Sequence, residues 1–245
     1  QKSSDDSAGL MTSEALRSDV RTLRQGVRNL NEGISLLNIV DGAINEEVSI
    51  IIRMRELSQQ AATGTIGATE RQSTNLEFIA MRTELNRISN TTEFNGIKLL
   101  DGTLSSAASD HISIQFGLDS KDDSNININR AVNITSLTSL RLNLNALSIA
   151  TQDGAVKANK ELQVTMNRLN KIRGRLGSTQ NRLERSLNNI LMAAENLTAA
   201  GATISDADMA LEFARLTKQQ ILVQSSSSMI GQANLFPQGV IQLLP

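Results

Sequence analysis

Residues 162–204 read LQVTMNRLNKIRGRLGSTQNRLERSLNNILMAAENLTAAGATI. Every seventh position of this stretch is apolar, and the set is Leu162, Leu169, Leu176, Leu183, Ile190, Leu197 and Ile204. A stripe that recurs every 3.5 residues stays on one side of a slightly under-wound helix, where a second helix can cover it. The sequence therefore predicts one long coiled-coil helix over about 156–204.

Such a helix is long for a chain of this size. At 1.5 Å per residue it would extend for roughly 70 Å. A compact globule of 245 residues has a radius of gyration of only about 18 Å. The helix cannot fit inside such a globule, so we predict an elongated molecule.

A second stripe of the same kind lies near the other end of the chain. Its members, again seven residues apart, are Leu16, Leu23, Leu30, Leu37, Ile44 and Ile51. Offset by four from the first five members lie Val20, Val27, Ile34, Asp41 and Val48, with Asp41 as the one clear break. We predict a helix over about 10–62 that pairs antiparallel with the helix over 156–204.

The segment between the two stripes contains shorter elements. Gly64 and Gly67 predict a turn, and Thr69 is a candidate N-cap for a helix over about 70–90. The side chains expected to face inward on that helix are Leu76, Ile79, Leu85 and Ile88. Alternation of polar and apolar residues on both sides of a polar turn predicts a β-hairpin over about 111–130.

A last helix is predicted over about 206–234, with a capping-box-like start at Asp206 and Asp208. Its apolar residues, spread over more than one face, include Phe213, Leu216, Val223 and Ile230. An exposed apolar helix usually marks an assembly surface. The predicted fold is therefore mainly α: an elongated antiparallel helical bundle with a small β-hairpin and a C-terminal helix.

Composition excludes most kinds of chemistry. The chain has no cysteine, tryptophan or tyrosine, and its only histidine, His111, cannot by itself build a zinc site. The net charge of −1 gives no electrostatic case for nucleic acid, and no apolar run is long enough to insert into a membrane. The carboxylate pairs Asp5-Asp6 and Asp206/Asp208 lie beside predicted helix starts, where the helix dipole favours them. We therefore expect no enzyme, catalytic residue, metal site or cofactor.

Several motifs at both ends resemble those of bacterial flagellin. The N-terminal matches are SDDSAGL at 4–10, RNLNEGISL at 28–36, RMREL at 53–57 and TEFNGIKLL at 92–100. The C-terminal matches are LGSTQNRL at 176–183, ENL at 195–197, ISDAD at 204–208 and QANLFPQ at 232–238. The resemblance covers about 1–100 and 156–245, and the central hairpin is similar to the small one in that family's rod domain.

The resemblance implies a structural subunit of the flagellar filament. Residues 1–210 would form the rod domain called D1, and 211–245 the C-terminal helix and tail of the filament core, D0. The implied partners are other flagellin subunits, an export chaperone and the filament cap, and the chain would be secreted by type III export into the extracellular filament. About forty residues of the family's N-terminal D0 segment would be lacking, which leaves the segment from 211 onward without its coiled-coil partner.

Some flagellins are recognised by a host Toll-like receptor through D1. Carried over by motif, the positions are Arg53 and Leu57 in RMREL, and Glu77 by an ungapped count back from FNG. Ser58-Gln59 stands where the family usually has Ala-Val. A contact between subunits in the filament is an equally good interpretation of these three residues.

Two alternatives of different kinds remain at the level of sequence. A hook-associated junction protein would share the terminal helices but be present in only a few copies per filament. A flagellin-like cell-surface protein would bind a ligand such as a polysaccharide. That second alternative predicts a cleft beside the hairpin with converging polar groups, for example Asn127 or Arg130.

Overall fold

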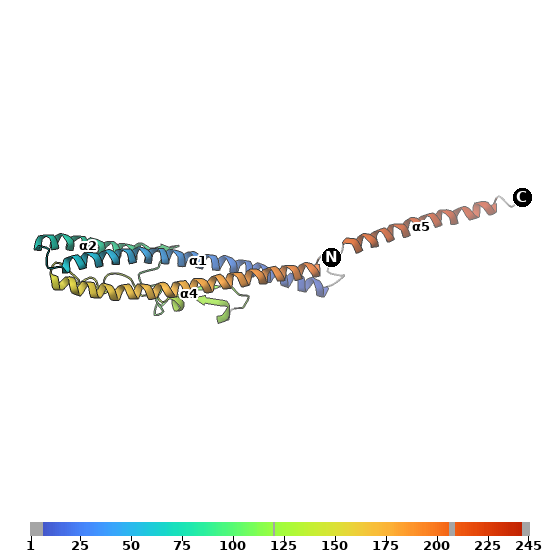
Figure 1. Ribbon diagram of the computed structural model, residues 1–245. Helices are drawn as coiled ribbons and strands as arrows, with labels where there is room; N and C mark the ends of the chain where they lie inside the picture. Colours follow the sequence, from blue (N-terminus) through green and yellow to red (C-terminus); the bar gives the residue numbers. More distant parts are fainter. Residues whose placement is uncertain (1–6, 120, 206–208, 242–245) are drawn as a thin grey trace. The chain divides into compact units, whose positions relative to one another are not determined.

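The structure is a computed structural model that describes residues 7–119, 121–205 and 209–241 (Figure 1). The chain divides into two units, one of residues 17–198 and one of residues 1–16 with 199–245. The long elements are α1 (Ser7–Ala62), α2 (Ala68–Thr91), α4 (Gln152–Ser205) and α5 (Met209–Ile241). The short elements are β1 (Glu93–Phe94), β2 (Ile97–Lys98), β3 (Ser113–Gln115), η1 (Asp122–Ser124), β4 (Asn125–Asn127) and α3 (Ile128–Val132).

Helices α1 and α4 lie side by side and antiparallel in the unit of residues 17–198 (Figure 1). Asn159 donates to Gln59 at 2.7 Å near one end of the pair. Further along, Gln180 donates to Asn38 at 2.8 Å, so residue numbers rise on one helix as they fall on the other. The predicted pairing of the two long helices is confirmed.

The two stripes form the core between these helices. From α1 the buried members are Leu23, Leu30, Leu37, Ile44 and Ile51, and from α4 they are Leu162, Leu169, Leu176, Leu183 and Ile190. Asp41, the break in the first stripe, accepts a hydrogen bond from Arg173 Nε at 3.3 Å. The prediction that Ile204 is covered is wrong, because its side chain is 37% exposed. The residues preceding it, Ala199 to Gly201, offer little apolar surface.

Helix α2 begins earlier than its predicted cap. The N-cap is Gly67, not Thr69, and the Gly67 amide donates to Glu70 at 3.1 Å. The predicted inward face was also partly wrong: Leu85 is buried, but Leu76 is 68% exposed and Ile79 is exposed as well. The residues that α2 buries are Thr74, Asn75, Phe78, Leu85 and Ser89.

The polar residues on the inner side of α2 hold the loop that leads back to α4. Asn75 Oδ1 accepts hydrogen bonds from the Ile149 amide at 2.9 Å and the Ser148 hydroxyl at 3.1 Å. Asn86 Oδ1 accepts one from the Ser139 amide at 2.8 Å. A loop without regular hydrogen bonds is thereby packed against a helix with these backbone amides satisfied.

The motif at residues 92–100 forms a small hairpin. Strands β1 and β2 pair antiparallel, with Phe94 opposite Ile97. Asn95 and Gly96 between them have φ values of 49° and 78°. A two-residue turn with both φ values positive is typical of Asn-Gly hairpins.

The predicted hairpin at 111–130 is confirmed as β3 and β4, with Ile114 opposite Ile126 and both side chains buried. It packs against α1 at two glycines. A Cβ at Gly26 would overlap the carbonyl oxygen of Phe116, and one at Gly33 would overlap the Ile114 side chain. Glycine at these positions lets the hairpin lie directly on the helix backbone.

The last helix extends beyond its predicted end at 234, because α5 runs from Met209 to Ile241. The proposed helix-start carboxylates Asp5, Asp6, Asp206 and Asp208 lie outside the described residues. Within the described part of the chain, no helix combines the length and the apolar character that crossing a bilayer requires.

Candidate functional site

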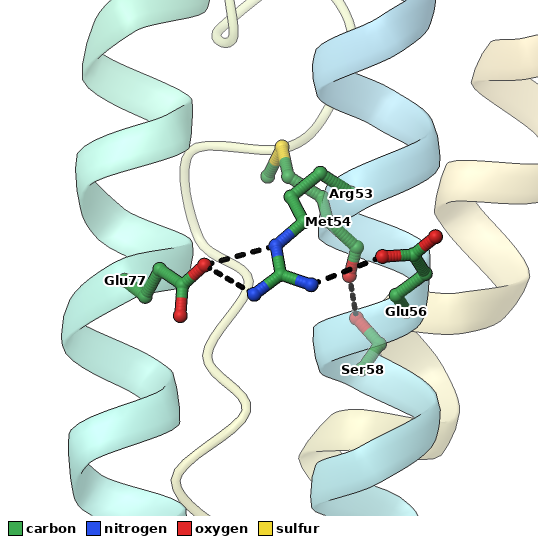
Figure 2. A network of polar contacts seen from close by, with 5 residues as sticks. All are labelled: Arg53, Met54, Glu56, Ser58 and Glu77. Atoms are coloured by element: carbon green, nitrogen blue, oxygen red, sulfur yellow. Dashed lines mark hydrogen bonds and ion pairs between the residues drawn. The ribbon is translucent and has the colours of Figure 1, made fainter.

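Arg53 is the centre of an exposed polar cluster between α1 and α2 (Figure 2). Its Nε and Nη2 atoms donate to the same Glu77 oxygen at 2.9 and 2.7 Å. Its Nη1 atom donates to Glu56 at 3.0 Å. The hydrogen bonds to Glu77, and after them those to Glu56, hold the pKa of Arg53 above its ordinary value. The cluster is therefore a pre-arranged patch of one cation and two carboxylates.

Of the three residues carried over by motif, the structure brings Arg53 and Glu77 together on the surface but places Leu57 in the core. The exposed fraction of the Leu57 side chain is 1%. Leu57 follows Met54, also buried, by three positions, so both point to the interior of the bundle. The expectation that Leu57 itself meets a partner does not fit this position, since a core side chain supports the surface from beneath.

The two residues that depart from the family pattern differ in their positions. The Ser58 hydroxyl is buried and donates to the Met54 carbonyl at 2.8 Å (Figure 2). Gln59 is exposed and accepts the hydrogen bond from Asn159. Compared with the family's usual Ala-Val, Ser58 therefore leaves the exposed surface unchanged, whereas Gln59 alters it.

Helix α5 carries the second candidate surface. The four predicted assembly residues are exposed: Phe213 by 60%, Leu216 by 53%, Val223 by 66% and Ile230 by 62%. Leu216, Val223 and Ile230 are seven apart, so they form one stripe. Among the side chains described on this helix, Ile221, Leu222 and Met229 are exposed as well. A helix that is apolar on several sides is normally covered on several sides.

A polar cavity of about 440 Å³ lies beside the β3–β4 hairpin. It is lined by Ser113, Asn125, Asn127, Arg130, Ala131 and Arg182. The cleft predicted by the ligand-binding alternative is thus present, with Asn127 and Arg130 in its wall. Arg182 of α4 was not foreseen, because it is far from the hairpin in sequence.

Other kinds of site find no support in the described part of the chain. No group of three or more metal-ligating side chains occurs among the residues that the structure describes. His111 is exposed, and its Nδ1 atom lies 3.1 Å from Asn127 Nδ2. The candidate sites are therefore the Arg53 cluster, the apolar residues of α5 and the cavity beside the hairpin.

The comparisons with known proteins agree at both ends of the chain. The model of the bacterial flagellin N-terminal helical region matches residues 1–105, and that of the C-terminal helical region matches residues 160–244. A flagellin of Bacillus subtilis (strain 168) is 36% identical over 277 residues, which span 99% of this chain and 88% of that protein. The chain belongs to the bacterial flagellin family.

Further relatives agree in sequence and in fold. A flagellin of Halalkalibacterium halodurans is 37% identical over 243 residues, spanning 99% of this chain and 86% of that protein. The crystal structure of Bacillus cereus flagellin matches with a TM-score of 0.56 and 30% identity, over 71% of this chain and 94% of that one. The chain is a structural subunit of the flagellar filament, the extracellular polymer that flagellins form, and the predicted mainly helical fold with a small β-hairpin is confirmed.

Proposed function

We propose that this flagellin joins its neighbours in the filament through helix α5. The observation that carries the proposal is the exposure of the stripe Leu216, Val223 and Ile230 together with Phe213, each more than half exposed. Covering apolar surface contributes about 25 cal/mol per Å², so such a helix is stabilised when other subunits surround it. Filament growth requires a contact between different surfaces that does not close into a ring.

The test replaces the stripe residues and measures polymerisation. A triple variant, Leu216→Ser with Val223→Ser and Ile230→Ser, is mixed with filament seeds, and pelletable polymer is measured and imaged by electron microscopy. We expect polymer yield to fall at least about tenfold, because several large apolar side chains are lost from one interface. The matched control is Gln220→Ser on the same helix. Equal yields from the triple variant and the control would refute the proposal.

We also propose the division into a rod, residues 1–210, and a C-terminal segment for assembly, residues 211–245. All described side chains from 213 to 233 are exposed, which supports this division. Limited proteolysis of the monomer is expected to remove the C-terminal segment first and to leave a stable fragment. Early cleavage within α1 or α4 between residues 17 and 198 would count against this division.

We propose that the Arg53 cluster contacts a neighbouring subunit in the filament. We also propose that a host Toll-like receptor binds the same cluster on a subunit that has been released from the filament. The exposed ion pair of the cluster joins two helices and is held by hydrogen bonds, which supports a role in recognition. Arg53→Ala and Glu77→Ala are expected to lower a receptor reporter signal by about tenfold, as hot-spot arginines do. Arg87→Ala, which removes an exposed arginine paired with Glu84 within α2, is the control. An unchanged reporter signal in both cluster variants would mean that the receptor does not bind through this cluster.

Secretion by the flagellar type III apparatus is proposed from membership of the family, with the export chaperone and the filament cap as transient partners. The chain is expected in the medium of cells with an intact export apparatus. In cells without that apparatus it should remain inside. Equal amounts in the two media would contradict this route.

A further inference from the structure

The polar cavity beside the hairpin is lined by cations without counter-charges. Arg130 comes from α3 and Arg182 from α4, so two guanidinium groups on different elements line one space. The other polar lining residues are Ser113, Asn125 and Asn127, and no lining residue is acidic. A volume of about 440 Å³ lies within the range of small-ligand pockets.

The wall of the cavity is fixed in place by hydrogen bonds. Asn127 Oδ1 accepts from the Arg130 amide at 3.0 Å, and Asn127 Nδ2 lies against His111. Behind this wall the fully buried Asn129 donates to the carbonyls of Thr103 and Ser105 at 2.7 and 3.0 Å. These contacts hold the short α3 helix in one orientation relative to β4, so the cavity exists before a ligand arrives.

The two cavity arginines differ from several, though not all, of the other arginines. In the described part of the chain, Arg53, Arg87 and Arg173 each form an ion pair with a carboxylate. Arg82 donates instead to backbone carbonyls. Neither the Arg130 nor the Arg182 guanidinium has an ion pair or hydrogen bond with a described residue. Two like charges that line one cavity repel each other, and an anion between them removes that repulsion.

We propose that this cavity binds an oxyanion: a phosphate, sulfate or carboxylate group, either free or carried on a sugar. A guanidinium presents a planar fork of N–H donors that matches such groups in a bidentate way. The amides of Asn125 and Asn127 and the Ser113 hydroxyl add neutral donors. These neutral groups suit the remaining oxygens of the anion or the hydroxyls of a sugar that carries it.

The surface next to the cavity supplies a matched control. A second depression of about 520 Å³ follows α4 and is lined by Ser178, Asn181, Arg182, Arg185, Ser186 and Asn189. Arg182 belongs to both spaces, whereas Arg185 lines only the second. Replacing Arg185 removes the same charge from the same helix, three residues away, and leaves the lining of the cavity intact.

The experiment titrates the monomeric full chain with sodium sulfate, sodium phosphate, glucuronate or glucose, each against sodium chloride of equal ionic strength. Binding is followed by NMR through the side-chain amides of Asn125 and Asn127. We expect saturable shifts with the oxyanions and none with glucose. The dissociation constant should rise at least about tenfold in Arg130→Gln and in Arg182→Gln, which each remove a charged hydrogen-bond donor, and should change little in Arg185→Gln.

Some outcomes distinguish a carboxylate carried on a sugar from a free inorganic anion, and others would overturn the proposal. Tighter binding of glucuronate than of sulfate and phosphate would assign the carboxylate of a sugar, and the reverse would assign a free inorganic anion. Equal weakening in Arg185→Gln would reduce the effect to general attraction by surface charge, which salt screens, and would overturn the proposal. Shifts that sodium chloride reproduces, or that glucose produces, would overturn it as well.

Discussion

Helices α4 and α5 are both rich in apolar residues, but among the side chains that the structure describes only α4 buries a stripe of them. On α4 the large apolar side chains recur every seven residues and face α1, so Leu169, Leu176 and Leu183 are buried. On α5 they occur on several sides, and all described side chains from 213 to 233 are exposed. The contrast teaches that the arrangement of apolar residues, rather than their number, decides whether a helix buries them against another helix of its own chain.

The most direct way to break this comparison is to shorten one isoleucine side chain in the core between α1 and α4 and one on α5. Ile44→Ala removes a fully buried side chain from α1, and the monomer should lose about 2–5 kcal/mol of stability because a cavity remains. Ile230→Ala on α5 should leave the unfolding midpoint of the bundle unchanged. Urea unfolding of both variants, followed by circular dichroism, measures the difference. A comparable loss in both variants would mean that α5 is packed within the monomer.

The buried carboxyl group of Glu47 in α1 makes the stability of the packed helices depend on pH. Its two oxygens are buried without a hydrogen-bond partner among the described residues, and burial raises the pKa of Glu47 to about 8 from 4.5. The folded state then holds a proton that the unfolded state releases as pH rises above 4.5. Stability is therefore highest below that pH and falls up to pH 8, at up to about 1.4 kcal/mol per pH unit.

The pH dependence of unfolding isolates this effect. Between pH 5 and 8 the parent chain is expected to lose a few kcal/mol that Glu47→Gln does not lose. Glu46→Gln, at the exposed neighbouring position, serves as the control and should keep the slope of the parent. A slope that survives in Glu47→Gln would show that another group is responsible.

The smallest expected effect concerns the glycines of α1. Gly26→Ala forces a Cβ against the Phe116 carbonyl, and such overpacking costs about 1–3 kcal/mol, partly offset by about 1 kcal/mol of helix propensity. A Cβ at Gly42 would meet no atom within 4 Å, so Gly42→Ala should stabilise the chain by about 0.5–1 kcal/mol. Urea midpoints that shift in opposite directions are expected for the pair, and stabilisation by both substitutions would exclude close docking of the hairpin.

The long helices could be predicted because one periodic pattern determines both their secondary structure and their packing. The stripes bury the members of the seven-residue repeat from Leu23 to Ile51 on α1 and from Leu162 to Ile190 on α4. The face of α2 could not be predicted in this way. Its buried side includes Thr74, Asn75 and Ser89, and Asn75 is buried because it bonds to the Ile149 amide, a partner that no local pattern reveals.

The candidate sites were predictable to different degrees for the same reason. Arg53 and Glu77 were named from motifs, and the structure joins them by an ion pair at 2.7 Å. The cavity beside the hairpin was expected only from Asn127 and Arg130. Arg182 completes it from another helix, and only the antiparallel packing of α4 brings that residue to the hairpin.

The antiparallel pairing of α1 and α4 also sets the order in which this chain can fold. The side chains that bond across the two helices are separated by 100, 132 and 142 residues. Closing loops of that length before any contact is gained makes folding slow. A chain that is released N-terminus first therefore leaves the side of α1 that faces α4 uncovered until residues 152–205 have followed.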